Sequence, residues 1–285
     1  MANIRDIKNR INSVKNTRQI TNAMKMVAAS KLKKAQERII SARPYADFIE
    51  FMIRSVKHKN PETTNPFLTG RLNTPEKKLL IVLTSDRGLC GSFNSNIIRT
   101  ATKYLSENPD VGVICVGKKG YDQIKKKTDK IIGKYVNFFN EMNFLRTVEI
   151  SKSVIELYNK GDYTQVSVIY NEFKSAIQQN IVEKQLLPIM PCESTAVSSV
   201  DYIYEPDENT IIEELGTKYI DVEIWRMMLE SSAAEQGARM TAMDNATENA
   251  SELIEALTLM HNRARQASIT TEIIEIASGA EAINE

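Results

Sequence analysis

The stretch NIRDIKNRINSVKNTRQITNAMKMVAASKLKKAQERIISARPY (residues 3–45) decides the fold of this 285-residue chain. No glycine or proline precedes Pro44, so nothing in residues 1–43 interrupts a helix. Apolar residues recur at heptad-like spacings of three and four, with a phase shift near residues 15–19; they are Ile4, Ile7, Ile11 and Val14, then Ile20, Met24, Val27, Leu32, Ala35 and Ile39. The pattern predicts one long helix with a coiled-coil face, which Pro44 kinks or ends although residues 45–56 keep helical character.

The last 79 residues predict a second long helix. Apolar positions again step by three, four or seven residues, at Leu253, Leu257, Met260, Ala264, Ala267 and Ile274. An unbroken helix there would be about 120 Å long at about 1.5 Å per residue, too long for a compact body of this size. We therefore expect an antiparallel two-helix coiled coil that projects from a globular domain. Two shorter core helices, broken at Gly237, remain the alternative.

Charge is divided between the two ends of the chain. Residues 1–40 hold ten basic and two acidic residues, whereas residues 207–285 hold five basic and sixteen acidic ones, although the whole chain has a net charge of only +1. The basic run Lys31, Lys33, Lys34 and Arg38 could suit nucleic acid, but no aromatic residue is interleaved for base stacking. We expect this basic face to pair with acidic residues of the late helix.

The middle of the chain predicts an α/β domain. Buried-type strands are expected at residues 79–84, 111–116 and 166–171, with a fourth at 183–189, and helices follow the first two strands and cover residues 145–158. Alternating strands and helices predict a mostly parallel sheet. The fold class is therefore α/β with a long coiled coil: helix 1–57, linker 58–75, a Rossmann-like domain over 76–207, and helix 208–285.

The glycine loops of this domain lack the residues that bind nucleotides. The loop Asp86–Gly91 follows the first strand, where doubly wound folds bind phosphates, but has neither a P-loop lysine nor a GxGxxG pattern, and Gly117–Gly120 also falls short. Both are expected to be close-packed turns. Three scattered cysteines and two histidines provide no metal-ligand spacing, so we expect no metal site, and with both glycine loops incomplete we expect no cofactor.

Four segments resemble the gamma subunit, the central rotor shaft, of F-type ATP synthase. They are residues 3–45, TSDRGLCG at 84–91, DYIYEPD at 201–207 and ARQASITTEIIEIASGA at 264–280; the last carries Ile269, Thr270, Glu272, Glu275, Gly279 and Ala280 of the family pattern. The resemblance covers essentially the whole chain. It implies a non-catalytic rotor that couples rotation of a membrane ring of c subunits to ATP synthesis or hydrolysis at the beta subunits.

The resemblance also assigns roles to single residues. Met24 matches a position facing the lower rim of the beta subunits; Arg239 and Gln266 match positions that bind a beta-subunit catch loop, with Thr270, Glu272 and Glu275 in the adjacent polar cluster. Tyr202 and Tyr204 match positions at the foot that meet the c ring. The implied partners are three alpha and three beta subunits, the epsilon subunit and the c ring.

The amino-terminal pattern continues without a cleavage-like break, which favours a mature helix over a transit peptide. The expected location is thus the cytoplasmic side of a bacterial inner membrane, peripheral to it. Two other functions remain open from the residues alone. One is a coiled-coil protein that binds nucleic acid through its basic helix, and the other is a dinucleotide-dependent enzyme built on the α/β domain.

Overall fold

The computed structural model describes residues 4–60, 62–71, 75–139, 142–176, 178–189, 202, 204, 205 and 207–284. The two long helices that the sequence predicts are both present: α1 (Ile4–Lys59) and α6 (Glu208–Asn284). Helix α1 continues through Pro44, and α6 continues through Gly216 and Gly237. The sequence left a kink or an end at Pro44 open, and α1 does not end there, in keeping with the expected helix over 1–57. The alternative break at Gly237 is wrong.

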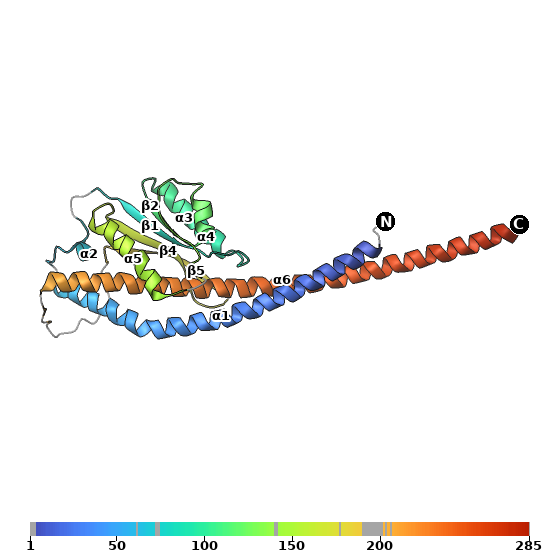
Figure 1. The fold of residues 1–285 in the computed structure, drawn as a ribbon, viewed down its shortest axis with the longest axis horizontal. Helices are drawn as coiled ribbons and strands as arrows, with labels where there is room; N and C mark the ends of the chain where they lie inside the picture. Colours follow the sequence, from blue (N-terminus) through green and yellow to red (C-terminus); the bar gives the residue numbers. More distant parts are fainter. Residues whose placement is uncertain are drawn as a thin grey trace. The chain divides into compact units, whose positions relative to one another are not determined.

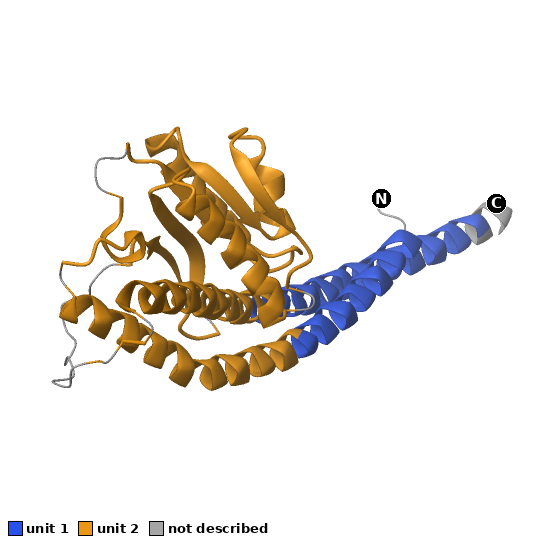
Figure 2. Cartoon of the chain, turned by 60° about the vertical axis from the view of Figure 1, so that its left-hand side comes forward, with its two compact units in different colours: residues 1–27, 240–285 blue, residues 28–239 orange. Residues whose placement is uncertain are grey.

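The chain divides into two compact units, which Figure 2 colours separately. Unit 1 comprises Met1–Val27 and Met240–Glu285, and unit 2 comprises Ala28–Arg239. Both long helices contribute to each unit.

Unit 2 contains a five-stranded sheet with the order β3-β2-β1-β4-β5. The strands are β1 (Lys78–Leu83), β2 (Gly112–Val116), β3 (Ile131–Tyr135), β4 (Gln165–Phe173) and β5 (Gln179–Leu187). The first four are parallel along the sheet, and β5 pairs antiparallel with β4. The predicted class, a mostly parallel α/β domain with long terminal helices, is confirmed.

Helices cover both faces of this sheet, which explains why β1, β2 and β4 are almost continuously apolar. Alternate residues point to opposite faces. Leu79, Ile81 and Leu83 pack in one core with α1, with α5 (Phe144–Asn159), with α6 and with the short α2 (Pro66–Thr69). Leu80 and Val82 pack in the other, with α3 (Phe93–Glu107) and α4 (Lys118–Ile124).

A buried ionic group fastens α6 to the sheet. The carboxylate of Glu223, which is almost inaccessible, accepts hydrogen bonds from Lys184 of β5 at 2.7 Å and from Arg226 at 3.2 Å. A buried carboxylate needs such partners because desolvation of its charge is otherwise costly. These bonds therefore fix the angular position of this part of α6 against the domain.

Strand β3 and helix α2 were not predicted. Strand β3 is an edge strand whose side chains alternate between half-buried and exposed, and it contains Gly133, so it lacks the apolar run that marks a central strand. Within the described residues, no helix is both long enough and apolar enough to span a membrane.

Candidate partner interfaces

The two helices of unit 1 pack antiparallel on each other. Ile7 and Ile11 of α1 share a small core with Leu257 of α6, and Val14 and Ala264 flank it. Further along, the hydroxyls of Thr21 and Thr247 lie 2.7 Å apart. The residue numbers rise on one helix as they fall on the other, as expected of an antiparallel coiled coil.

An ion pair joins the two helices of unit 1: Lys25 Nζ lies 2.6 Å from Asp244 Oδ1. The run Lys31, Lys33, Lys34 and Arg38 is exposed and, within the described part of the chain, forms no ion pair. Among the described residues, the predicted pairing of this basic face with the acidic helix is therefore not made by close ion pairs, although the charge of Lys31 acts to lower the pKa of Glu235 of α6. Buried Ala28, Leu32, Ala35 and Ile39 hold this part of α1 instead.

Helix α6 carries an exposed surface near its carboxyl end. Every described side chain over residues 265–279 is exposed. Ile269, Ile273 and Ile276 follow a spacing of four and three residues, so they form an apolar stripe along one side of the helix. Ile274 is also exposed, at 58%, but lies about 100° around the helix from Ile273, outside this stripe. Side chains of this type gain most when a partner covers them, because an exposed apolar stripe has no other means of leaving water.

The residues predicted to contact the beta subunits fall in both units. Met24 is half-buried on α1 in unit 1. Gln266 and Thr270 lie one turn apart near the isoleucine stripe, and Thr270 Oγ1 donates to the Gln266 backbone carbonyl at 2.9 Å. Glu272 and Glu275 are exposed on another side of α6. Arg239, in contrast, is largely buried in unit 2.

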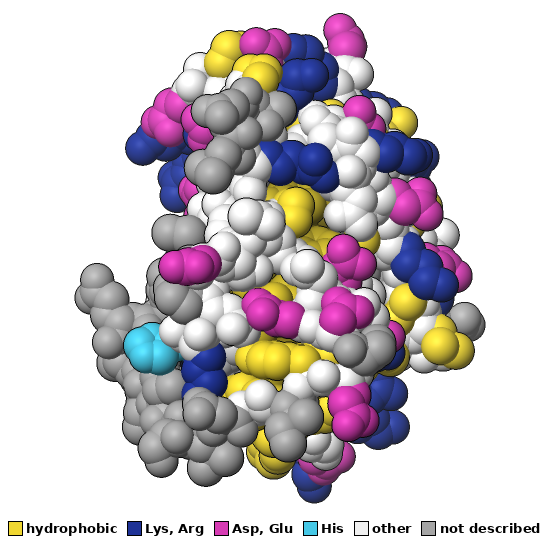
Figure 3. Space-filling model, turned by 90° about the vertical axis from the view of Figure 1, so that its left-hand side faces the viewer, with side chains coloured by type: hydrophobic (Ala, Val, Ile, Leu, Met, Phe, Trp, Pro, Cys, Tyr) yellow, Lys and Arg dark blue, Asp and Glu magenta, His cyan; other side chains and the backbone are white. Residues whose placement is uncertain are grey.

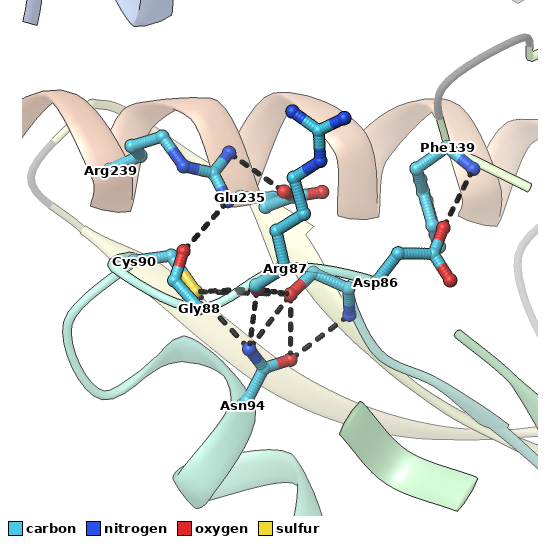
Figure 4. A network of polar contacts seen from close by, with 9 residues as sticks. Asp86, Arg87, Gly88, Cys90, Asn94, Phe139, Glu235 and Arg239 are labelled. Atoms are coloured by element: carbon cyan, nitrogen blue, oxygen red, sulfur yellow. Dashed lines mark hydrogen bonds and ion pairs between the residues drawn. The ribbon is translucent and has the colours of Figure 1, made fainter. Parts of the chain in front are cut away.

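Figure 4 shows what holds Arg239. Its guanidinium pairs with Glu235 Oε1 at 2.7 Å, and Nη2 donates to the backbone carbonyl of Gly88 at 3.2 Å. Burial raises the pKa of the Glu235 carboxyl, and the guanidinium of Arg239 acts against that shift. Sequence reasoning missed Glu235, although its position four residues before Arg239 is the signature of a helical ion pair.

The loop that contains Gly88 is braced from within. Asn94 of α3 donates to Ser85 Oγ at 2.8 Å and contacts Cys90 Sγ at 3.2 Å, while its Oδ1 accepts from the Ser85 backbone at 3.0 Å. Asp86 accepts hydrogen bonds from three backbone N–H groups: Lys118 at 3.0 Å, Asn137 at 2.8 Å and Phe139 at 3.3 Å. Cys90 is buried, and burial raises the pKa of its thiol.

These contacts explain why the loop is a poor phosphate site. The Asp86 carboxylate occupies the amino end of α4, where a phosphate would need the N–H groups and the positive end of the helix. Gly120 approaches Thr84 so closely that its N–H donates to Thr84 Oγ1 at 2.8 Å. A Cβ at Gly117 would lie 2.0 Å from the Thr84 carbonyl oxygen. The glycines thus permit close packing of backbone, as the sequence predicted.

Tyr202 and Tyr204 lie in unit 2 and pack edge to face, with ring centroids 6.4 Å apart. Asn60 Nδ2 donates to the Tyr204 hydroxyl at 2.8 Å, and Lys59 Nζ lies 4.8 Å from the centre of the Tyr202 ring. Both rings also pack on the domain core. Figure 3 looks onto the side of the molecule that lies at the left of Figure 1, where hydrophobic side chains reach the surface among acidic and basic ones.

Comparisons with known proteins agree with this architecture. A family model described as ATP synthase matches residues 3–283. The gamma chain of ATP synthase from Pelodictyon phaeoclathratiforme is 48% identical, covering 99% of each chain, and that from Chloroherpeton thalassium is 45% identical, covering 100% of this chain and 99% of the other.

Solved structures of ATP synthases also contain chains that are similar to this one. A chain from the central stalk and c ring of Tetrahymena thermophila mitochondrial ATP synthase is 30% identical with a TM-score of 0.63, covering 80% of this chain and 99% of that one. A chain from the Euglena gracilis mitochondrial enzyme, 20% identical, has the same fold with a TM-score of 0.69, covering 98% and 94%. The comparisons give no support to a nucleic-acid-binding function.

Proposed function

Because the chain belongs to the ATP synthase gamma family, we propose that it is the central-stalk rotor of an ATP synthase, coupling rotation of a membrane ring to ATP synthesis or hydrolysis at other subunits. The observation that carries this proposal is the exposed end of α6, where the isoleucine stripe and Gln266 lack cover. In this proposal the chain has no catalytic residue. Its work is mechanical.

The partners of unit 1 are three alpha and three beta subunits around the helices. A shaft drives chemistry only if it binds the conformations of the surrounding sites unequally, because equal affinity for two states shifts neither. Gln266 and Thr270 lie beside the isoleucine stripe, whereas Glu272 and Glu275 lie on another side of α6, so the helix has chemically distinct sides. Rotation then presents a different side to each beta subunit in turn.

Met24 and Arg239 serve this coupling differently. Met24 is unbranched, flexible and half-buried, so it slides past charged rim residues without forming a bond that would resist rotation. Arg239 is already bound to Glu235 and the Gly88 carbonyl, but a guanidinium has five N–H donors. Its remaining donors are available to a catch loop of a beta subunit.

Tyr202 and Tyr204 make the foot that meets the c ring, with the epsilon subunit beside it. Tyrosine suits this position because its ring packs on the domain while its hydroxyl reaches polar groups of a partner. In this proposal the chain is a peripheral subunit held by its contact with the ring, on the cytoplasmic side of a bacterial inner membrane.

The test is isolation of the tagged chain from gently solubilised membranes, followed by native mass spectrometry and an ATPase assay on the same sample. We expect one copy of the chain with three alpha and three beta subunits, with activity in the complex and none in the free chain. Recovery of a lone chain or homodimer that binds or hydrolyses nucleotide would refute the proposal and return attention to the α/β domain.

A further inference from the structure

The loop Asp86–Gly91 is held at its ends and strained at its tip. Asp86 and Asn94 fix the ends through the bonds described above. At the tip, Leu89 adopts a left-handed backbone with φ of 61° and exposes 64% of its side chain. A leucine in this conformation is unfavourable unless the surrounding structure imposes it, so something must hold the tip in place.

The contact that α6 makes with this tip comes from Arg239. The Gly88 carbonyl, immediately before Leu89, accepts the hydrogen bond from Nη2, and Glu235 fixes the orientation of the guanidinium through Nη1. Both side chains are close to fully buried, at 12% and 6% exposure, so water competes weakly for them. The bond therefore joins the tip to one defined turn of α6 (Figure 4).

Cys90 lies beneath the closed loop. Its sulfur lies 3.2 Å from Asn94 Nδ2 and 3.8 Å from the Arg87 carbonyl oxygen, and the residue is almost inaccessible. Cys90 also packs in the core between the sheet and α3, so displacement of residues 87–89 would remove only the part of its cover that the loop supplies. While Arg239 holds the Gly88 carbonyl, the side chains of Arg87 and Leu89 face solvent in a fixed orientation.

We propose that Arg239 is a positioning residue that latches the loop Asp86–Gly91 onto α6, keeping Leu89 in its strained conformation and Cys90 covered. Twisting of α6 against the domain pulls on the Gly88 carbonyl, so the latch links the position of this helix to the orientation of Arg87 and Leu89. The inference concerns contacts within the chain. It gives Arg239 a role separate from the proposed catch-loop contact and is tested on the chain without a beta subunit.

The reaction of Cys90 with the thiol reagent DTNB measures opening of the latch. Two single-cysteine forms of the full-length chain are needed: a Cys90-only form, with Cys115→Ala and Cys192→Ser, and a Cys115-only form, with Cys90→Ala and Cys192→Ser. Cys115 lies in β2, in the same apolar core as Cys90, and is equally buried, so it reports general loosening of that core.

In the Cys90-only form, Arg239→Gln should speed the reaction about tenfold, the lower end of what loss of a hydrogen bond from a charged donor does to an equilibrium. Cys115 should react at its original rate. Arg239→Lys, which keeps one charged donor, should restore part of the protection. Arg99→Gln, at an exposed position of α3, is the matched control and should change neither rate.

An unchanged Cys90 rate in Arg239→Gln, or an equal rise for both cysteines, would overturn the latch. If Arg239→Gln does not fold, Glu235→Gln gives the second test, because it keeps the side-chain volume and removes the charge that orients the guanidinium. Loss of the Glu235 charge alone lowers the pKa of the Cys90 thiol, so the rates are compared per thiolate. A smaller but selective acceleration of Cys90 is then expected, and its absence would refute the proposal.

Discussion

Replacing Leu257 by alanine should separate the helices of unit 1 without unfolding unit 2. Leu257 is 7% exposed, and its described core neighbours are Ile7 and Ile11, with Val14 and Ala264 at the edge. Buried leucine-to-alanine changes cost about 2–5 kcal/mol, and a contact between two helices can close partly over the gap, which places this one near 2 kcal/mol. That energy corresponds to a roughly 30-fold increase in local opening.

Hydrogen exchange measures this opening directly. Amides of α1 near Ile7 and Ile11 should exchange about 30-fold faster in Leu257→Ala, whereas amides of β1 and β4 should keep their rates, because local opening exposes only the elements that lose their contact. Leu259→Ala is the matched control, since that leucine is 53% exposed two residues along the same helix. Equal exchange in the two variants would refute the packing argument.

Three further outcomes follow from single contacts. Met24→Lys should lower ATP-driven proton pumping more than assembly of the complex, since a lysine can bond to the acidic rim residues; normal pumping would contradict the role of Met24. Gly117→Ala should cost at least about 3 kcal/mol in urea unfolding, because of its φ of 98° and the clash with the Thr84 carbonyl, and a loss below about 1 kcal/mol would count against this geometry. Burial raises the pKa of Tyr158 to about 12 while its hydroxyl donates to the Pro66 carbonyl, so the folded state retains that proton above the unfolded pKa of about 10. Stability should therefore fall from about pH 10 to 12, and less steeply in Tyr158→Phe; parallel curves would exclude the effect.

The elements that sequence predicts well are those whose pattern is strong and local. Strand β1 is almost uniformly apolar because both faces of the sheet are covered, and α1 lacks breakers over its first 40 residues. The local pattern could not decide between a kink and an end at Pro44, because tertiary packing offsets the local cost of proline: Ala46, Ile49 and Ile53 are buried just after it, so continuing the helix gains apolar burial.

The opposite net charges of the two ends were the weakest predictor of how the two long helices pack. The opposite charges of the two ends predicted that Lys31, Lys33, Lys34 and Arg38 would pair with the late acidic helix, yet these side chains remain in solvent. Exposed ion pairs contribute only about 0–1 kcal/mol each, too little to set the register of two helices against the burial of Leu32 and Ile39.

The polar contacts around Arg239 could not be predicted from sequence because they join residues far apart in the chain. The pair with Glu235 follows from helical spacing, but the bond to Gly88 depends on where the sheet sets the loop relative to α6. The buried pair of Glu223 and Lys184 has the same origin. Such contacts appear only when the fold is known.

The exposed apolar residues of α6 bear directly on how a shaft selects between states. Moving one site from 1:99 to 99:1 requires about 5.5 kcal/mol of differential contact. Fully covering one large aliphatic side chain contributes about 1.5–3 kcal/mol, so the stripe of Ile269, Ile273 and Ile276 could supply that difference if one partner conformation covers it and another does not. A stripe on one side of the helix can do this, whereas an evenly apolar surface would contact all three surrounding sites alike. The selectivity of the proposed rotor therefore depends on how unevenly these side chains are distributed around α6.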